Sequence, residues 1–83
     1  GYQEGLRIGV NIVDVYVAQN MDNLASDIAR GDGEYLNTLA TLMKVDDRYQ
    51  FKKKLKRNFR KIYSSKDVTS KEVVANIKNI YNS

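Results

Sequence analysis

The strongest chemical signal in this sequence is a group of cations in the segment 52–61. Five of them are expected on one face of a helix, opposite its apolar side chains: Lys53, Lys56, Arg57, Arg60 and Lys61. Such a face can bind the phosphates of nucleic acid or the headgroups of anionic lipids. It can equally be a solvated face whose lysine stems cover apolar surface. The sequence shows no geometry for reading bases, so these cations are candidate anion-binding residues and nothing narrower.

Two acidic pairs, Asp32 with Glu34 and Asp46 with Asp47, offer oxygen ligands of the kind that calcium prefers. A calcium loop needs five or more ligands in a spaced series, and neither pair supplies them. Paired carboxylates for acid–base catalysis need a pocket that gives them opposed environments, whereas these acids are expected to face solvent. Helix capping is therefore the favoured role for both pairs.

Several residue types that carry chemistry are absent. The chain has no histidine and no cysteine, which removes the commonest general base, the commonest metal ligand and any thiolate nucleophile. We therefore expect no catalytic residue, no metal, no cofactor and no small-molecule substrate. The sequence has no apolar run near the roughly 20 residues that a membrane span needs, so we expect no transmembrane helix.

The tripeptide Arg30-Gly31-Asp32 spells an integrin-binding motif, but three residues are a very weak signal. The favoured interpretation is that these residues end one helix and begin the next. Gly31 suits the left-handed residue that follows a helix C-terminus, and Asp32 suits the cap before the next helix.

Charge is unevenly distributed along the chain. Residues 1–43 have a net charge of −4, and residues 44–83 have a net charge of +8. This asymmetry is compatible with three interpretations: an anionic partner, pairing between the acidic and the basic half within the chain, or a solvated surface without a partner.

The elements that position these groups are predicted to be helices, because apolar residues recur at helical spacing in four segments. The four segments are 13–30, 33–44, a third from a cap at Asp46 or Asp47 to about Tyr63, and a fourth that follows a capping box of Thr69 and Glu72. The sequence thus predicts an all-α fold, a small bundle of four helices in a single domain (13–83), preceded by a lead-in (1–12).

The lead-in is apolar, and its conformation is left open between strand and helix. Leu6, Ile8, Val10 and Ile12 alternate as in a strand, yet the chain offers no second strand to pair with them. Side chains this apolar are unfavourable in water. We therefore expect these four residues to dock on a partner protein or to mediate self-association.

Two stretches, NMDNLASDIARGDGEYLNTLATLMKV and NFRKIYSSKDVTSKEVVANI, resemble the C-terminal half of a family of small exported bacterial proteins known as a domain of unknown function. The matching pattern includes Gly31 to Glu34, the Asn58-Phe59 pair and Asp67-Val68-Thr69. The resemblance spans about residues 15–80. Family members usually carry a signal peptide and a cysteine-containing region, and Tyr2 stands where a cysteine would be expected. The resemblance implies export to the bacterial envelope or periplasm, and no activity.

These observations predict a non-enzymatic module of the bacterial cell envelope with a structural or protein-interaction role. The alternative is a basic helical module that binds nucleic acid or anionic lipid through the third helix.

Overall fold

The computed structural model describes residues 11–83, which form six α-helices and no strand. The all-α fold expected from the sequence is confirmed. The helices are α1 (Ile12–Gln19), α2 (Met21–Arg30), α3 (Glu34–Leu42), α4 (Arg48–Arg57), α5 (Phe59–Ile62) and α6 (Ser70–Asn82).

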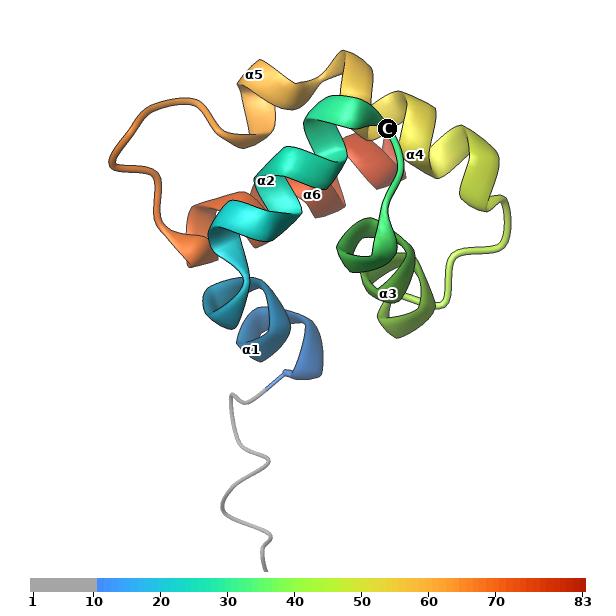
Figure 1. The fold of residues 1–83 in the computed structure, drawn as a ribbon, viewed down its shortest axis with the longest axis horizontal. Coiled ribbons are helices and arrows are strands. Elements are labelled where there is room, and N and C mark those ends of the chain that lie inside the picture. Colours follow the sequence, from blue (N-terminus) through green and yellow to red (C-terminus); the bar gives the residue numbers. More distant parts are fainter. Residues whose placement is uncertain (1–10) are drawn as a thin grey trace, which may run out of the picture.

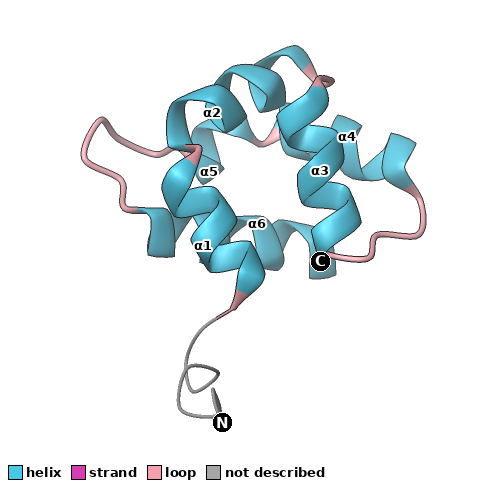
Figure 2. Cartoon of the chain, turned by 60° about the horizontal axis from the view of Figure 1, so that its bottom comes forward, coloured by secondary structure: helices cyan, strands magenta, loops and turns pink. Residues whose placement is uncertain are grey.

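The six helices pack against one another in one connected arrangement. Helix α2 contacts α1, α3, α4 and α5, and helix α6 contacts α1, α4 and α5. Figure 1 shows α4 and α5 along the upper edge of the molecule, with α1 and α3 below them. Figure 2, which brings the lower side forward, shows that every described element is a helix or a loop. Within residues 11–83, no helix is both long and apolar enough to cross a bilayer.

The core is built from the apolar faces that the helical spacing predicts. All six helices contribute to it, and its largest fully buried side chains are Val17, Leu24, Ile28, Leu36, Leu39, Leu55, Ile62, Val73 and Ile77. Among the described residues, one charged side chain is buried with them, the carboxylate of Asp27, which is 5% exposed.

The first predicted helix is broken into two, so the expectation of one helix over 13–30 was wrong. The break lies at Asn20 (φ −134°, ψ 32°). Its side-chain amide donates to the Tyr16 carbonyl at 2.8 Å, and its own carbonyl accepts the amide of Leu24 at 2.8 Å. Asn20 thereby ends α1 and begins α2. Its side-chain amide takes the Tyr16 carbonyl, which a backbone amide would bond to if the helix continued.

The third predicted helix is broken in the same way at Asn58, which separates α4 from α5. Its side-chain amide donates to the Lys54 carbonyl at 2.8 Å. Its carbonyl accepts the amides of Lys61 and Ile62 at 2.9 and 3.1 Å. The apolar face nevertheless continues past the break, because Ile62 of α5 is buried in the same core as Phe51 and Leu55 of α4.

Helix α3 begins and ends inside its predicted range, 33–44. At its C-terminus Lys44 adopts a left-handed conformation (φ 56°). The amide of Val45 then donates to the Ala40 carbonyl at 3.0 Å, and the amide of Lys44 donates to the Thr41 carbonyl at 3.1 Å. This pair of bonds is the Schellman arrangement, and it ends the helix before Lys44.

Two of the predicted helix caps are confirmed. Asp47 accepts the amide of Gln50 at 3.1 Å and caps α4, so of the two aspartates proposed for that role it is the second. Thr69 and Glu72 form the predicted capping box at the start of α6, with amide–oxygen distances of 2.9 and 3.1 Å.

Gly31 has the predicted left-handed conformation, with φ 83°. Replacing Gly31 by valine is expected to lower the free energy of unfolding by about 1–2 kcal/mol, because side chains with a Cβ are strained in this region. Urea denaturation measures the effect. Gly31→Asn is the control, since asparagine tolerates the left-handed region and brings a Cβ to the same place, 2.8 Å from Lys56 Cδ. Equal midpoints for valine and asparagine would contradict the conformational explanation.

The hydroxyl of Tyr63 donates to the Met21 carbonyl at 3.2 Å and links α2 to the end of α5. Burial, and to a lesser degree Asp22, raises the pKa of Tyr63 to about 12. Below pH 10 the hydroxyl is protonated in both the folded and unfolded states. As the pH rises from about 10 to about 12, the unfolded chain ionises first. The free energy of unfolding is therefore expected to fall across that window.

Urea denaturation of the wild-type chain and of Tyr63→Phe, between pH 9 and pH 12, tests this expectation. Lysine titration affects both proteins and cancels in the comparison. The variant should lose less stability than the wild type over the window, whereas identical pH slopes would show that Tyr63 does not couple ionisation to folding.

Candidate functional site

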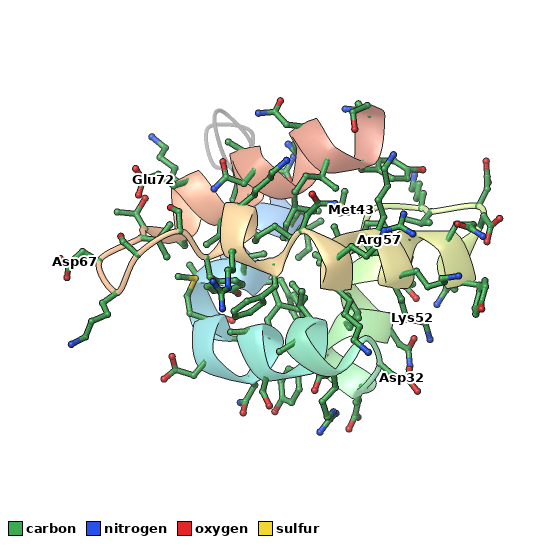
Figure 3. All side chains as sticks on the ribbon, turned by 90° about the horizontal axis from the view of Figure 1, so that it is seen from above. Asp32, Met43, Lys52, Arg57, Asp67 and Glu72 are labelled. Atoms are coloured by element: carbon green, nitrogen blue, oxygen red, sulfur yellow. The ribbon has the colours of Figure 1, made fainter. Side chains whose placement is uncertain are left out.

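The five cations predicted to share a face are all exposed on α4 and α5. Lys53, Lys56 and Arg57 belong to α4, and Arg60 and Lys61 belong to α5. Figure 3 looks onto the face that these two helices form, with Arg57 labelled. No aspartate or glutamate occurs in the sequence between Asp47 and Asp67. The structure therefore places five exposed cations on two consecutive helices.

Three other cations of α4 donate hydrogen bonds to oxygens within the chain: Arg48, Lys52 and Lys54. Lys52 Nζ lies 2.9 Å from the Asp32 carboxylate and 3.0 Å from Asn37 Oδ1 (Figure 3 shows Lys52 beside Asp32). The hydrogen bond from Lys52 holds the pKa of the exposed Asp32 carboxyl below its usual range. Arg48 donates to the Asn37 carbonyl at 3.4 Å, and Lys54 donates to the Ser83 carbonyl at 2.8 Å.

These contacts show how far the acidic N-terminal half of the sequence (1–43) pairs with the basic C-terminal half (44–83). Among the described residues, Asp32–Lys52 is the one ion pair that joins the two halves. Internal pairing therefore accounts for one cation, and most of the positive charge of α4 and α5 faces solvent.

Four of the exposed cations line an open hollow at the junction of α4 and α5. The hollow has a volume of about 310 Å³ and is lined by Lys56, Arg57, Asn58, Phe59, Arg60 and Lys61. The ring of Phe59 stacks on that of Tyr63 at a centroid distance of 5.4 Å. We call it the α4–α5 hollow. Lys53 lies outside it, 5.0 Å above the ring of Tyr49.

Sequence reasoning missed this hollow because it predicted one continuous helix through Asn58. The signal that could have revealed it is the asparagine itself. Asparagine is a weak helix former that bonds readily to nearby backbone, so an asparagine inside a helical pattern marks a candidate break.

Of the apolar residues proposed to contact a partner, Leu6, Ile8 and Val10 lie outside the described residues. Ile12 lies at the first position of α1, where Asn11 caps the helix by accepting the amide of Val13 at 2.8 Å. The Ile12 side chain is 61% exposed, and Val15, one turn later, is 38% exposed. Helix α1 thus presents an apolar edge to solvent at its N-terminal end.

Both charged residues of the tripeptide in the turn between α2 and α3 have partners within the chain. Arg30 lies 2.8 Å from the Asp27 carboxylate and also donates to the Asp32 carbonyl at 3.3 Å, while the Asp32 carboxylate is bonded to Lys52. Asp32 does not cap α3, so that prediction was wrong. Residues 11–83 also contain no group of three or more acidic, histidine or cysteine side chains that could hold a metal ion.

Asp27 takes the capping role instead. Its Oδ2 accepts the amides of Tyr35 and Leu36 at 2.8 and 3.2 Å, and these amides belong to the first turn of α3. Gly33 (φ 133°) brings the backbone close enough for this contact. We call this arrangement the Asp27 cap. It is a structural device, and the sequence alone gives no sign of it, because carboxylate and amides are eight and nine residues apart.

Comparisons with known proteins identify a family for this chain. Residues 6–83 match a family described as a protein of unknown function (DUF3015). The comparisons with curated proteins and with solved structures gave no match. Because the family match covers nearly the whole sequence, including the turn and the cationic helices, the chain belongs to the DUF3015 family.

Proposed function

We propose that this chain is a non-enzymatic module of the bacterial cell envelope that binds a protein partner or a second copy of itself. The binding surface consists of the apolar residues Leu6, Ile8, Val10 and Ile12 together with Val15. We call this set the N-terminal apolar surface.

The observation that carries the proposal is the exposure of Ile12 and Val15 on α1. Val13 and Val17 of the same helix point into the core, so α1 is apolar on two sides and only one of them is covered by the described chain. Fully burying a side chain of this size is worth about 1.5–3 kcal/mol, which favours association of the uncovered side with another apolar surface.

The assignment to the envelope comes from the resemblance of the sequence to exported bacterial proteins. The non-enzymatic role is supported by the absence of histidine and cysteine. It is also supported by four described carboxylates that are engaged in caps and ion pairs: Asp27, Asp32, Asp47 and Glu72.

Sedimentation equilibrium over a range of protein concentrations, with capture from envelope extract, tests the proposal. The full chain should self-associate or retain a partner. The Ile12→Ser/Val15→Ser variant should weaken that association by about tenfold or more. Deletion of residues 1–10, which leaves the Asn11 cap in place, should weaken it further.

Tyr49→Ser is the matched control, because Tyr49 is the other large exposed apolar side chain, 66% exposed on α4. It should leave association unchanged. A full chain that is monomeric at all concentrations and retains no protein would contradict the proposal, and so would equal losses in the control and in the α1 variant.

A further inference from the structure

We propose that the α4–α5 hollow binds the phosphate group of an organic phosphate, held by Arg57 and Arg60 with Lys56 and Lys61 beside them. This site lies on different helices from the N-terminal apolar surface, and it does not depend on the function proposed above. A lipid headgroup and a soluble phosphate ester both present non-bridging phosphate oxygens, and the experiment below separates them.

The first argument is the way in which the cations of α4 and α5 divide into two groups. Arg48, Lys52 and Lys54 donate to oxygens of the described chain, and Lys53 lies over a tyrosine ring. The four cations without such a contact among residues 11–83 are the four that line the hollow: Lys56, Arg57, Arg60 and Lys61. Of the eight cations on α4 and α5, the four that line the hollow are thus the ones that contact neither an oxygen nor a ring of the described chain.

The second argument is electrostatic. Lys56, Arg57, Arg60 and Lys61 lie within six residues of the sequence and line one hollow. Like charges gathered this closely repel each other. Among residues 11–83, no carboxylate forms an ion pair with any of the four cations. A bound anion would relieve this repulsion, which is the behaviour expected of a binding site rather than of a face that only confers solubility.

The third argument concerns the kind of anion. Arginine presents a planar fork of donors that matches two phosphate oxygens at once, and two arginines line the hollow. The hollow is larger than a phosphate group alone, and Phe59 in its lining offers apolar contact to the part of the ligand that carries the phosphate. Both features favour a phosphate ester over a small inorganic anion.

A nucleic-acid strand fits these observations less well. A strand presents a row of phosphates, and it is bound by cations that track the backbone over several nucleotides. Here Lys52 and Lys54, the cations next to the hollow along α4, are tied to Asp32 and to the Ser83 carbonyl. The available charge is concentrated within residues 56–61, which suits one phosphate group.

The test uses the full chain and three probes: glycerol 3-phosphate, vesicles of phosphatidylcholine with and without phosphatidylglycerol, and a DNA duplex. Backbone amide NMR spectra recorded at constant ionic strength locate binding of the soluble ester. Vesicle sedimentation measures binding to lipid. The variant Arg57→Gln/Arg60→Gln removes two positive charges from the hollow. The matched control Lys71→Gln/Lys78→Gln removes two exposed positive charges from α6.

Glycerol 3-phosphate should shift the amides of residues 56–61, or vesicles should bind only when they contain phosphatidylglycerol. In either case, the hollow variant should lose about tenfold or more in affinity, and the control less than about twofold. Binding to vesicles without binding to the ester identifies a lipid headgroup, and the reverse identifies a soluble ester. Both results support the site, provided that circular dichroism shows both variants folded.

Three results would overturn the proposal. One is the absence of binding to both the ester and the vesicles. Another is an equal loss of affinity in the hollow variant and in the α6 control, which would show that overall charge alone is responsible. The third is tighter binding to the DNA duplex than to either phosphate probe, which would make the surface a nucleic-acid interface.

Discussion

Replacing Gly33 by valine is expected to lower the free energy of unfolding by about 3–5 kcal/mol and the melting temperature by roughly 12 °C or more. Gly33 has φ 133° and ψ 164°, a region that is accessible essentially to glycine alone. A Cβ at this position would also collide with the Asp27 carboxylate. The carboxylate would have to move away from the amides of Tyr35 and Leu36, so backbone strain and lost hydrogen bonds act together.

Thermal and urea denaturation measure this effect. Ala29→Val is the matched control, because it adds a larger side chain at an exposed position of the neighbouring helix α2, where the backbone is ordinary. It should cost no more than about 0.7 kcal/mol. If Gly33→Val falls within about 1 kcal/mol of that control, position 33 tolerates a side chain and the explanation of the turn is wrong.

The Asp27→Ala variant is expected to lose about 2–4 kcal/mol of unfolding free energy. The buried carboxylate accepts two backbone amides of α3 and pairs with Arg30 at 2.8 Å. Hydrogen bonds to a charged acceptor are worth about 1.5–3 kcal/mol each, and the orphaned amide of the buried Leu36 adds a desolvation cost. The Arg30 side chain stays in solvent, so its loss of a partner contributes little.

Two further variants separate the cap from other effects of removing Asp27. Asp27→Asn keeps an acceptor oxygen and should recover part of the loss, whereas Asp22→Ala removes an exposed carboxylate from the same helix and should cost about 1 kcal/mol at most. The double variant Asp27→Ala/Gly33→Val should lose less than the sum of the two single losses, because both remove the same contact. Strictly additive losses would show that Gly33 and Asp27 act independently.

The parts of the fold that the sequence predicts correctly depend on contacts between residues close together in the chain. Gly31, the Asp47 cap and the Thr69–Glu72 capping box each depend on residues within about four positions. The apolar faces follow from spacing alone, and Leu55 and Ile62 of the third predicted helix lie in the core.

The parts that the sequence does not predict depend on contacts between residues farther apart, or on a competition between side chain and backbone. Asp32 is the obvious candidate to cap α3, yet Lys52, twenty positions away, holds its carboxylate. Asn20 and Asn58 lie inside strong apolar patterns, and their side chains nevertheless bond to backbone and divide each helix.

The candidate sites divide in the same way. Helical spacing predicts that the five cations lie opposite the apolar side chains, and the structure shows all five exposed on α4 and α5. It does not predict that four of them surround a hollow, because the hollow arises from the break at Asn58.

The Asp27 cap also sets the length of the turn between α2 and α3. A carboxylate on the last turn of one helix reaches the first amides of the next only if the intervening chain keeps its length. One residue more or fewer between Asp27 and Tyr35 would carry those amides out of reach. The cap therefore has a sequence signature of its own: an aspartate, a glycine four positions later, and a second glycine two positions after that. A relative that keeps this spacing can build the same turn, and a relative with an insertion there needs a different acceptor for the first amides of its third helix.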